Sequence, residues 1–447
     1  MKRTRQSSSD RISNLPANVI ERILQFLPIE DAVETSTLST QWRKIWAGIP
    51  KLVLNGFLAR IHDNGNHPSD SNRLMLNVYK FLMLHDAKID NLVLGFPGLR
   101  PSPDIDHMIL YLSKKGVEGL TIIFTDDDDI DYSTCPKSGR NIPNSLFSAR
   151  QLKFLKLHGC GFQPPSCFVG FGRLITLELK KVHLGPNFFN KFIPKCSCLE
   201  YLSLIECELD GKKAEIVAPS LITLIFNSDY RSICFKNTPL LSTVSTLQDY
   251  KYCYEETSFE VEEDKPDIAA VFASLPAIEE LNVGTEFFLL CTAGHVPYKL
   301  STELLHLKEV IIVNVLLSSL PEARIFVCLI MSSPNLHRLT ISLDDDNDDH
   351  QPTEVIGSLQ MVLEAEEIPA TCFQCLEEFN MHDCRGTKIE LELLRFVLAS
   401  GPVLRKITIE PNDGMDSSKG LDFLMEVTQC RRASKEAEVI YLKSHER

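Results

Sequence analysis

The chain has 447 residues, of which 44% are hydrophobic and 24% are charged, so it has the composition of a globular protein with room for two or three domains. Its formal net charge of -14 argues against general binding of nucleic acids, because contacts with phosphates need a basic surface. No apolar run is long enough to span a bilayer and no export signal is visible, so we expect reduced cysteines and an intracellular location in the nucleus or cytoplasm.

Three short helices are predicted near the N-terminus, over residues 16–27, 31–38 and 41–47. Apolar residues recur at helical spacing in the first, and Pro28 interrupts it because proline cannot continue a helix. Both tryptophans of the chain, Trp42 and Trp46, lie in the third helix. A segment this short buries little apolar surface by itself, so we expect it to pack against something else.

The order of residues in this segment resembles the F-box of plant F-box proteins. The resemblance is carried by Leu15-Pro16, the Pro28 break, Asp31-Ala32-Val33, Leu38-Ser39, Trp42 and Trp46. In that family the helices bind a Skp-type adaptor, which links the protein to a cullin-based ubiquitin ligase. The resemblance implies the same role here, with adaptor contacts from Leu15, Pro16, Ile20, Ile23, Leu27, Pro28, Val33, Leu38 and Trp42. Glu34 is a departure, because relatives commonly carry Arg there.

One apolar pattern returns along the rest of the chain: an apolar residue, two variable ones, an apolar one, one variable one and an apolar one. Its clearest copies begin at Leu152, Leu174, Leu199 and Leu221, with spacings of 22, 25 and 22 residues. These spacings fall in the leucine-rich repeat range of about 20 to 29 residues. Weaker copies begin at Ile89, Val117, Leu241, Ile278, Leu307, Leu336, Leu376 and Leu404.

The spacing of the pattern has a structural reason. Two apolar residues separated by one residue lie on the same face of a short strand, and stacking the copies side by side buries that face. The pattern therefore predicts an irregular leucine-rich-repeat solenoid. Together with the resemblance of the N-terminal segment, it implies an α/β fold in which a short three-helix F-box is followed by this solenoid. In this solenoid a curved parallel sheet has helices or turns on its outer face.

Cysteines and prolines support the register of the repeats. Cys160, Cys207 and Cys384 each lie three residues beyond the last apolar position, where leucine-rich repeats commonly hold Asn or Cys. Proline lies two residues ahead of the first apolar position in five copies, where a strand begins and its missing N–H is tolerated. A zinc site at the C-x-x-C pair of Cys372 and Cys375 is not favoured, because no second ligand pair follows at zinc spacing.

The C-terminal part resembles the FBD domain of plant F-box proteins. The matching residues are Leu376-Glu377-Glu378-Phe379, Arg385-Gly386-Thr387, the helical run 389–399, Gly401-Pro402-Val403-Leu404, Arg432-Ala433-Ser434 and Glu438-Val439-Ile440. The layout therefore resembles that of the F-box/LRR/FBD family. We expect a disordered tail over 1–9, an F-box over 10–54, repeats over 55–365 and FBD-like repeats over 366–447.

Motifs of catalysis and cofactor binding are not found. The chain has no nucleophile elbow, no zinc-protease helix and no phosphate-binding loop, so we predict no catalytic residue, no metal, no cofactor and no enzymatic activity. Two acidic runs, 126–131 and 344–349, follow predicted strands without the spacing or glycine turn of a calcium loop. They are interpreted as solvated loops between repeats.

The register also predicts which side chains face the concave side of the sheet, where a target protein is expected to bind. These contacts are Phe154, Lys156, His158, Glu178, Lys180, Tyr201, Ile225 and Arg338. Their mixture of aromatic and charged groups suits a protein partner better than a nucleic acid or a membrane.

These observations predict the substrate-receptor subunit of a Skp-cullin-F-box ubiquitin ligase, which binds the adaptor through its F-box and an unknown target through its repeats. Two alternatives stay open. One is an interaction scaffold that acts outside a ligase, suggested by Glu34. The other is a sensor in which a small ligand completes the site for a degron.

Overall fold

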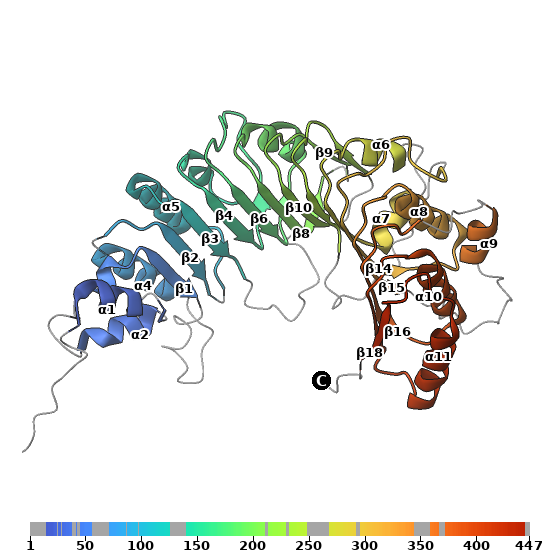
Figure 1. Cartoon of the computed structure of the whole chain (residues 1–447). Helices are drawn as coiled ribbons and strands as arrows, with labels where there is room; N and C mark the ends of the chain where they lie inside the picture. The colour runs from blue at the N-terminus through green and yellow to red at the C-terminus, as the bar shows by residue number, and fades with distance from the viewer. Residues whose placement is uncertain are drawn as a thin grey trace, which may run out of the picture. The chain divides into compact units, whose positions relative to one another are not determined.

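The computed structural model shows a chain of alternating strands and helices (Figure 1). It describes residues 15–24, 26–27, 29–37, 42, 45–55, 71–85, 87–96, 98–125, 140–210, 213–228, 232–247, 268–291, 296–343, 358–365 and 372–442. The predicted tail over 1–9, Pro28, Leu38 and both acidic runs lie outside the described residues. Among the described helices, none is long and apolar enough to cross a membrane.

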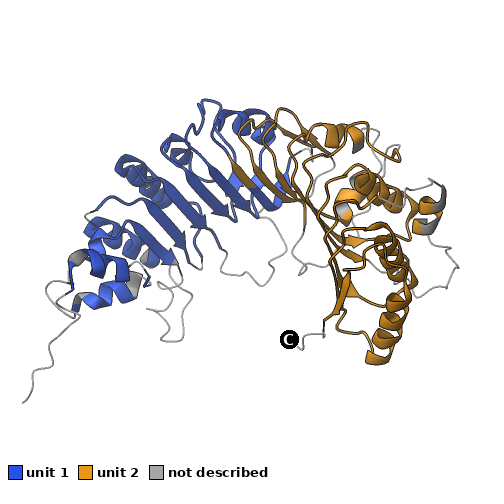
Figure 2. Ribbon diagram, in the orientation of Figure 1, with its two compact units in different colours: residues 1–199, 203–210 blue, residues 200–202, 211–447 orange. Residues whose placement is uncertain are grey.

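The chain divides into two compact units (Figure 2). Unit 1 consists of residues 1–199 and 203–210, and unit 2 consists of residues 200–202 and 211–447. Strand β8 (Tyr201–Leu209) contributes residues to both units. This division is different from the predicted F-box, repeat and FBD-like segments, so each unit is described by itself.

Unit 1 contains parallel strands that follow one another in chain order. They are β1 (Lys51–Asn55), β2 (Asn91–Gly95), β3 (Gly119–Ile123), β4 (Phe154–His158) and β6 (Thr176–Lys180), followed by β8. Short strands β5 (Gly161–Phe162) and β7 (His183–Leu184) pair beside them. Helices and helical turns lie on one face of these strands: α4 (Ser71–Leu84), α5 (Pro103–Lys115), η4 (Asn144–Ser148), η5 (Phe188–Phe192) and η6 (Ile193–Lys195) (Figure 1).

Unit 2 continues the same alternation of strand and helix. Its parallel strands are β10 (Thr223–Ser228), β12 (Thr243–Ser245), β13 (Glu280–Gly284), β14 (Glu309–Val315), β15 (Arg338–Leu343), β16 (Glu378–Cys384), β17 (Lys406–Pro411) and β18 (Glu438–Tyr441). Strands β9 (Lys213–Ile216) and β11 (Ser232–Phe235) form a separate pair. Its helices are α6 (Ile268–Ala273), α7 (Thr285–Cys291), α8 (Leu320–Met331), α9 (Ser358–Ala365), α10 (Lys388–Ser400) and α11 (Ser417–Gln429).

The predicted α/β fold class is confirmed, with a parallel sheet of 16 strands. Each predicted copy of the apolar pattern coincides with a strand. In the pairs β2–β3, β3–β4 and β4–β6 the last two apolar positions of one copy lie opposite those of the next. Leu155 of β4, for example, is opposite Leu177 of β6, and both are buried under the helices and turns. The repeats therefore bury one face of the sheet continuously, as their spacing predicts.

The structure adds a strand that the sequence interpretation assigned to the F-box. Ile49, Leu52 and Leu54 follow the apolar pattern of the repeats, and all three are buried. The strand that they form, β1, pairs in parallel with β2, with Leu52 opposite Leu92. The first strand of the sheet therefore begins directly after the N-terminal helices.

The bounds of these helices differ from the predicted ones. The first is α1 (Ala17–Leu24), which ends early because the N–H groups of Phe26 and Leu27 bond to carbonyls three residues back and tighten the chain into a turn. The second, α2 (Ile29–Glu34), begins two residues before its predicted start and continues as a 3₁₀ turn, η1 (Thr35–Thr37). In the third, the structure describes a 3₁₀ turn, η3 (Trp46–Gly48).

Within or directly after several strands the chain passes through a residue in the left-handed region, two positions beyond the last apolar residue. Gly159 and Lys181 directly follow β4 and β6, whereas Glu206, Asn314 and Asp383 lie within β8, β14 and β16. The φ of this residue is 73° at Gly159, 50° at Lys181, 52° at Glu206, 55° at Asn314 and 55° at Asp383. At Gly159 a Cβ atom would lie 2.5 Å from the carbonyl oxygen of Phe124, so glycine is required there by both conformation and space. The predicted cysteine position of the repeats comes directly after such a residue in three copies. Its occupants Cys160, Cys207 and Cys384 are all buried.

We expect Gly159→Ala to lower the free energy of unfolding by about 1 to 3 kcal/mol, because it adds both backbone strain and a contact with the Phe124 carbonyl. The matched control is Gly172→Ala, since no atom lies within 4 Å of the added Cβ there. Urea unfolding of the full chain followed by circular dichroism measures both changes. Equal midpoints for the two variants would contradict this prediction.

Candidate functional site

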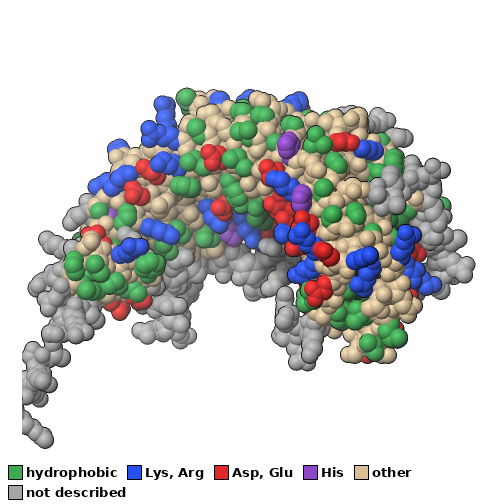
Figure 3. All heavy atoms as spheres, viewed as in Figure 1, with side chains coloured by type: hydrophobic (Ala, Val, Ile, Leu, Met, Phe, Trp, Pro, Cys, Tyr) green, Lys and Arg blue, Asp and Glu red, His purple; other side chains and the backbone are tan. Residues whose placement is uncertain are grey.

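Helix α1 leaves an apolar surface without cover in the described part of the chain. Ile20 and Leu24 point inward and are buried. The adjacent side of the helix and the turn that follows it carry exposed apolar side chains, namely Val19 (38% exposed), Ile23 (40%), Phe26 (82%) and Leu27 (38%), which we call the α1 surface. Figure 3 shows hydrophobic side chains gathered over these helices. Contiguous apolar patches of this kind mark sites of protein interaction.

The N-terminal helices rest on the sheet of unit 1. Helices α1 and α2 pack on η3, and α2 packs on β1. The indole ring of Trp46 meets the Phe81 ring of α4 edge-on, with 6.2 Å between centroids. The His85 ring lies between two carbonyl oxygens, with Nε2 2.8 Å from that of Ile49 and Nδ1 3.1 Å from that of Ala87. The helices are therefore joined to the repeats by packing and hydrogen bonds.

The structure places the predicted adaptor contacts in different surroundings. Pro16, Ile23 and Leu27 are exposed, and Leu15 and Val33 are partly buried. Ile20 and Trp42 are buried inside the chain, where they support the helices, and Pro28 and Leu38 lie outside the described residues. Val19 and Phe26 are exposed as well, and although both lie within the predicted helix, neither is among the predicted adaptor contacts.

On unit 1, the face of the sheet opposite the helices carries paired charges. We call this side of each unit its open face. Five predicted target contacts lie next to one another there, namely Phe154, Lys156 and His158 of β4 and Glu178 and Lys180 of β6. Lys156 Nζ is 2.7 Å from Glu178 Oε2, and Lys180 Nζ is 3.3 Å from Glu206 Oε1. Exposed ion pairs of this kind contribute at most about 1 kcal/mol to stability, so a partner can exchange them.

A second set of charges lies where the strands begin. Lys153 Nζ is 2.8 Å from a carboxylate oxygen of Glu118, and Lys88 Nζ is 3.2 Å from the other. Hydrogen bonds from these lysines lower the pKa of Glu118, and the bond from Lys153 has the largest effect. In unit 2, Lys308 lowers the pKa of Glu279 in the same way. These carboxylates therefore stay ionised at neutral pH, and their stabilising effect is lost only as the pH falls through their lowered pKa values.

The open face of unit 2 carries a row of alternating charges. Arg338 lies between two carboxylates, with Nη1 3.0 Å from Glu309 Oε2 and Nε 3.1 Å from Glu378 Oε2. In register, Lys406 lies opposite Glu378, and Glu438 lies opposite Lys406. The other two predicted target contacts, Tyr201 and Ile225, also belong to unit 2 and are partly buried. The predicted contacts thus divide between the open faces of two units.

Several thiols are unsuited to nucleophilic chemistry. Burial raises the pKa values of Cys196, Cys291 and Cys384 to about 12, so these thiols stay protonated at neutral pH. Cys167, Cys198 and Cys234 are exposed. Within the described residues, no group of three or more His, Cys, Asp or Glu side chains is placed to hold a metal ion.

Comparison with known proteins identifies the parts of the chain. Residues 12–53 match the F-box domain, residues 105–341 match the leucine-rich repeats of the FBD-associated F-box protein At5g56370, and residues 367–409 match FBD. The repeat match alone covers more than half of the chain. The chain belongs to the F-box/FBD/LRR-repeat family.

Two relatives within this family match along almost their whole length. The F-box/FBD/LRR-repeat protein At1g13570 of Arabidopsis thaliana is 28% identical over 442 residues, which cover 98% of this chain and 99% of that protein. The FBD-associated F-box protein At5g56370 of the same plant is 26% identical over 454 residues, covering 97% of this chain and all of that protein. The predicted order of F-box, repeats and FBD is therefore confirmed.

The family assignment gives the C-terminal motif a structural meaning. The FBD match spans β16, α10 and most of β17, which is one strand–helix–strand unit of the repeat. Thr387 caps α10, because its hydroxyl accepts a hydrogen bond from the Glu390 N–H (3.3 Å). The buried Glu390 carboxylate in turn accepts bonds from the backbone N–H groups of Arg385 (2.9 Å) and Thr387 (2.6 Å). The Arg385-Gly386-Thr387 motif therefore fixes the start of this helix.

Proposed function

We propose that this F-box/FBD/LRR-repeat protein is the substrate-receptor subunit of a Skp-cullin-F-box ubiquitin ligase. The α1 surface carries this proposal, because it leaves four large apolar side chains exposed within a segment that matches the F-box domain. A Skp-type adaptor would cover these side chains. Pro16, Ile23 and Leu27 would contribute contacts, together with Leu15, Val33 and the predicted but undescribed Pro28 and Leu38.

In the proposed function the protein promotes ubiquitin transfer by holding the target near the ligase, and it supplies no catalytic group. The F-box helices pack directly on the sheet of unit 1. A target held on an open face is thereby kept near the ligase, which raises its effective concentration at the ubiquitin carrier. We propose that Phe154, Lys156, His158, Glu178 and Lys180 in unit 1, and Tyr201, Ile225 and Arg338 in unit 2, contact the target. The proposed location is the nucleus or cytoplasm.

Co-purification of the full chain with a Skp-type adaptor and a cullin tests the proposal. We expect the double variant Leu15→Ala/Pro16→Ala to lose both partners, whereas Phe154→Ala, on the open face, keeps them. Full adaptor binding by the double variant would contradict the assigned docking segment. If the unmodified protein binds neither partner, the alternative of a scaffold outside a ligase is favoured, and the exposed Glu34 of α2 is then the residue to examine.

The double variant also serves to find the target. Deleting residues 10–54 would remove β1 and uncover the buried side of β2, so a deletion changes more than adaptor binding. The double variant leaves β1 in place, and we expect it to hold targets without passing them to the ligase. Proximity labelling with this variant and with the unmodified protein should therefore enrich the same open-face partners, with more of each target in the variant.

A further inference from the structure

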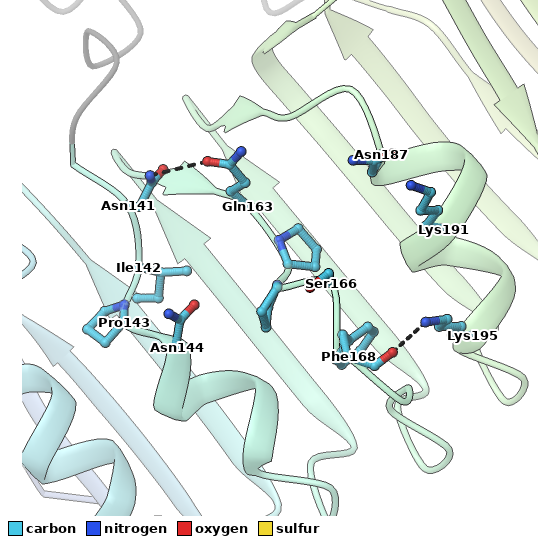
Figure 4. Close-up of a pocket in the computed structure, with 12 residues that line it drawn as sticks. Asn141, Ile142, Pro143, Asn144, Gln163, Ser166, Phe168, Asn187, Lys191 and Lys195 are labelled. Carbon is cyan, nitrogen blue, oxygen red and sulfur yellow. Dashed lines mark hydrogen bonds between the residues drawn. The ribbon is translucent and has the colours of Figure 1, made fainter.

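Unit 1 contains a pocket that belongs to neither the F-box helices nor the open face. Its volume is about 750 Å³, within the range of about 300 to 1,000 Å³ that is usual for small-molecule sites. Three segments line it, 141–144, 163–168 and 187–195 (Figure 4). None of the lining residues belongs to β4, β6 or β8, so a target on the open face leaves the pocket free.

A cluster of phenylalanine rings holds the three segments together beneath the pocket. Phe147 follows the first segment, Phe168 ends the second, and Phe192 lies in the third. The Phe168 ring stacks on Phe192 with 5.2 Å between centroids and meets Phe147 edge-on at 5.5 Å. Pro143, Pro164 and Pro165 lie in the wall, where their rings restrict the backbone. The pocket is therefore formed before any ligand arrives.

The third wall is a π-helix, η5, in which the N–H of Phe192 bonds to the carbonyl of Asn187 at 3.2 Å. This wide turn and the helical turn that follows it direct Asn187, Lys191 and Lys195 to the pocket (Figure 4). Turns of this kind are rare in proteins and are frequent at functional sites.

The polar groups of the pocket favour an anion. Among the described residues that line it there is no Asp or Glu, whereas Lys191 and Lys195 both belong to the lining. The Lys195 amine donates to the Phe168 carbonyl and lies 5.8 Å from the centroid of the Phe168 ring, so it is held in place. The Lys191 amine has no ion pair or hydrogen bond to the residues that the structure describes. It is thus the cation available to a ligand.

The remaining polar groups favour a ligand with hydroxyl groups. Four carboxamides surround the pocket, from Asn141, Asn144, Gln163 and Asn187. Asn141 Nδ2 donates to Gln163 Oε1 at 3.5 Å, a long bond that a ligand can replace. Each carboxamide both donates and accepts, as hydroxyl groups do. The proline and Phe168 side chains offer an apolar wall to the carbon skeleton.

We propose that this pocket binds a small polyhydroxylated anion, with its charged group on Lys191, its hydroxyl groups on the carboxamides and its carbon skeleton on the proline wall. The charged group is a phosphate or a carboxylate, because the oxygen atoms of both accept hydrogen bonds from an ammonium group. The pocket does not depend on the proposed ligase function, because its lining residues lie outside the F-box match.

Isothermal titration calorimetry of the full chain tests this site with four probes: glucose 6-phosphate, gluconate, glucose and inorganic phosphate. We expect binding of glucose 6-phosphate or gluconate, the difference between them identifying the anionic group, and much weaker binding of glucose and of inorganic phosphate. Lys191→Gln should weaken the preferred probe at least about tenfold, because it removes a charge-assisted hydrogen bond. The control Lys114→Gln removes an exposed lysine of α5 and should leave binding unchanged.

Three results would overturn the proposal. They are no binding of either polyhydroxylated anion, equal binding of inorganic phosphate, and unchanged affinity in Lys191→Gln. Asn144→Asp provides an independent variant, because it places a negative charge in the pocket and should also weaken binding. Circular dichroism of both variants verifies that the loss does not come from unfolding.

Discussion

Replacing Ile23 by Asp is expected to abolish binding of a Skp-type adaptor while the protein keeps its fold. Ile23 is 40% exposed and lies within the α1 surface, one helical turn from Val19. A carboxylate there would be buried without a partner when the adaptor docks, which opposes binding. We expect the affinity to fall at least about 100-fold, or about 2.7 kcal/mol, in calorimetric titration with the purified adaptor.

The control for this experiment is Met83→Asp. Met83 is 80% exposed on α4, outside the α1 surface, so it receives the same charge at an exposed apolar position elsewhere in unit 1. Adaptor binding should be retained. Equal affinity losses in the two variants would show that a charge on any exposed apolar residue weakens binding. This result would contradict the assignment of the α1 surface as the adaptor-binding site. Ile20→Asp cannot serve here, because Ile20 is buried.

The largest effect on stability is expected for Phe192→Ala, at about 3 to 5 kcal/mol. Phe192 is fully buried, and its ring lies 4.9 Å from that of Phe162 and 5.4 Å from that of Phe188. Removing it leaves a cavity among rings that come from separate repeats and cannot collapse together. Urea unfolding of the full chain, followed by far-ultraviolet circular dichroism, should show an earlier transition for this variant.

Phe154→Ala is the matched change outside the core. Phe154 is 47% exposed on the open face of β4, so its truncation leaves no cavity and should cost less than about 1 kcal/mol. A similar shift for both variants would mean that the ring cluster does not stabilise unit 1. Phe192→Ala should also abolish ligand binding in the pocket, because Phe192 supports Phe168 in its wall.

The repeat fold could be predicted from the sequence because its signal is local. Two apolar residues with one residue between them must share a face of a strand, and their recurrence then sets the register between neighbours. Strand β1 was not predicted, because the resemblance to the F-box runs through Leu54 and conceals the repeat pattern of Ile49, Leu52 and Leu54. Strand β18 was not predicted either, since the residue three before Val439 is Glu436 rather than an apolar residue.

The surfaces could be predicted less well, and the reasons are physical. Helical spacing identifies Val19, Ile20 and Ile23 as apolar positions of one helix, but it does not tell which of them the core covers and which stay exposed. The pocket had no sequence signal, because its prolines and carboxamides come from three segments that meet only through the packing of Phe147, Phe168 and Phe192. A site assembled from loops has no regular spacing of apolar residues from which it could be predicted.

Strand β1 belongs both to the F-box match and to the sheet, and it therefore fixes the distance between the F-box and each later strand of unit 1. The F-box match ends at residue 53, in the middle of a strand that is hydrogen-bonded to β2, so no hinge separates the adaptor module from the sheet. Neighbouring strands lie about 4.8 Å apart, and β4 is three strands from β1, so the proposed target contacts of β4 lie about 14 Å along the sheet from β1. Changing this distance would require the gain or loss of whole repeats. Exchanging the F-box of two relatives at residue 53 would join the chains in the middle of β1, whose backbone is hydrogen-bonded to β2.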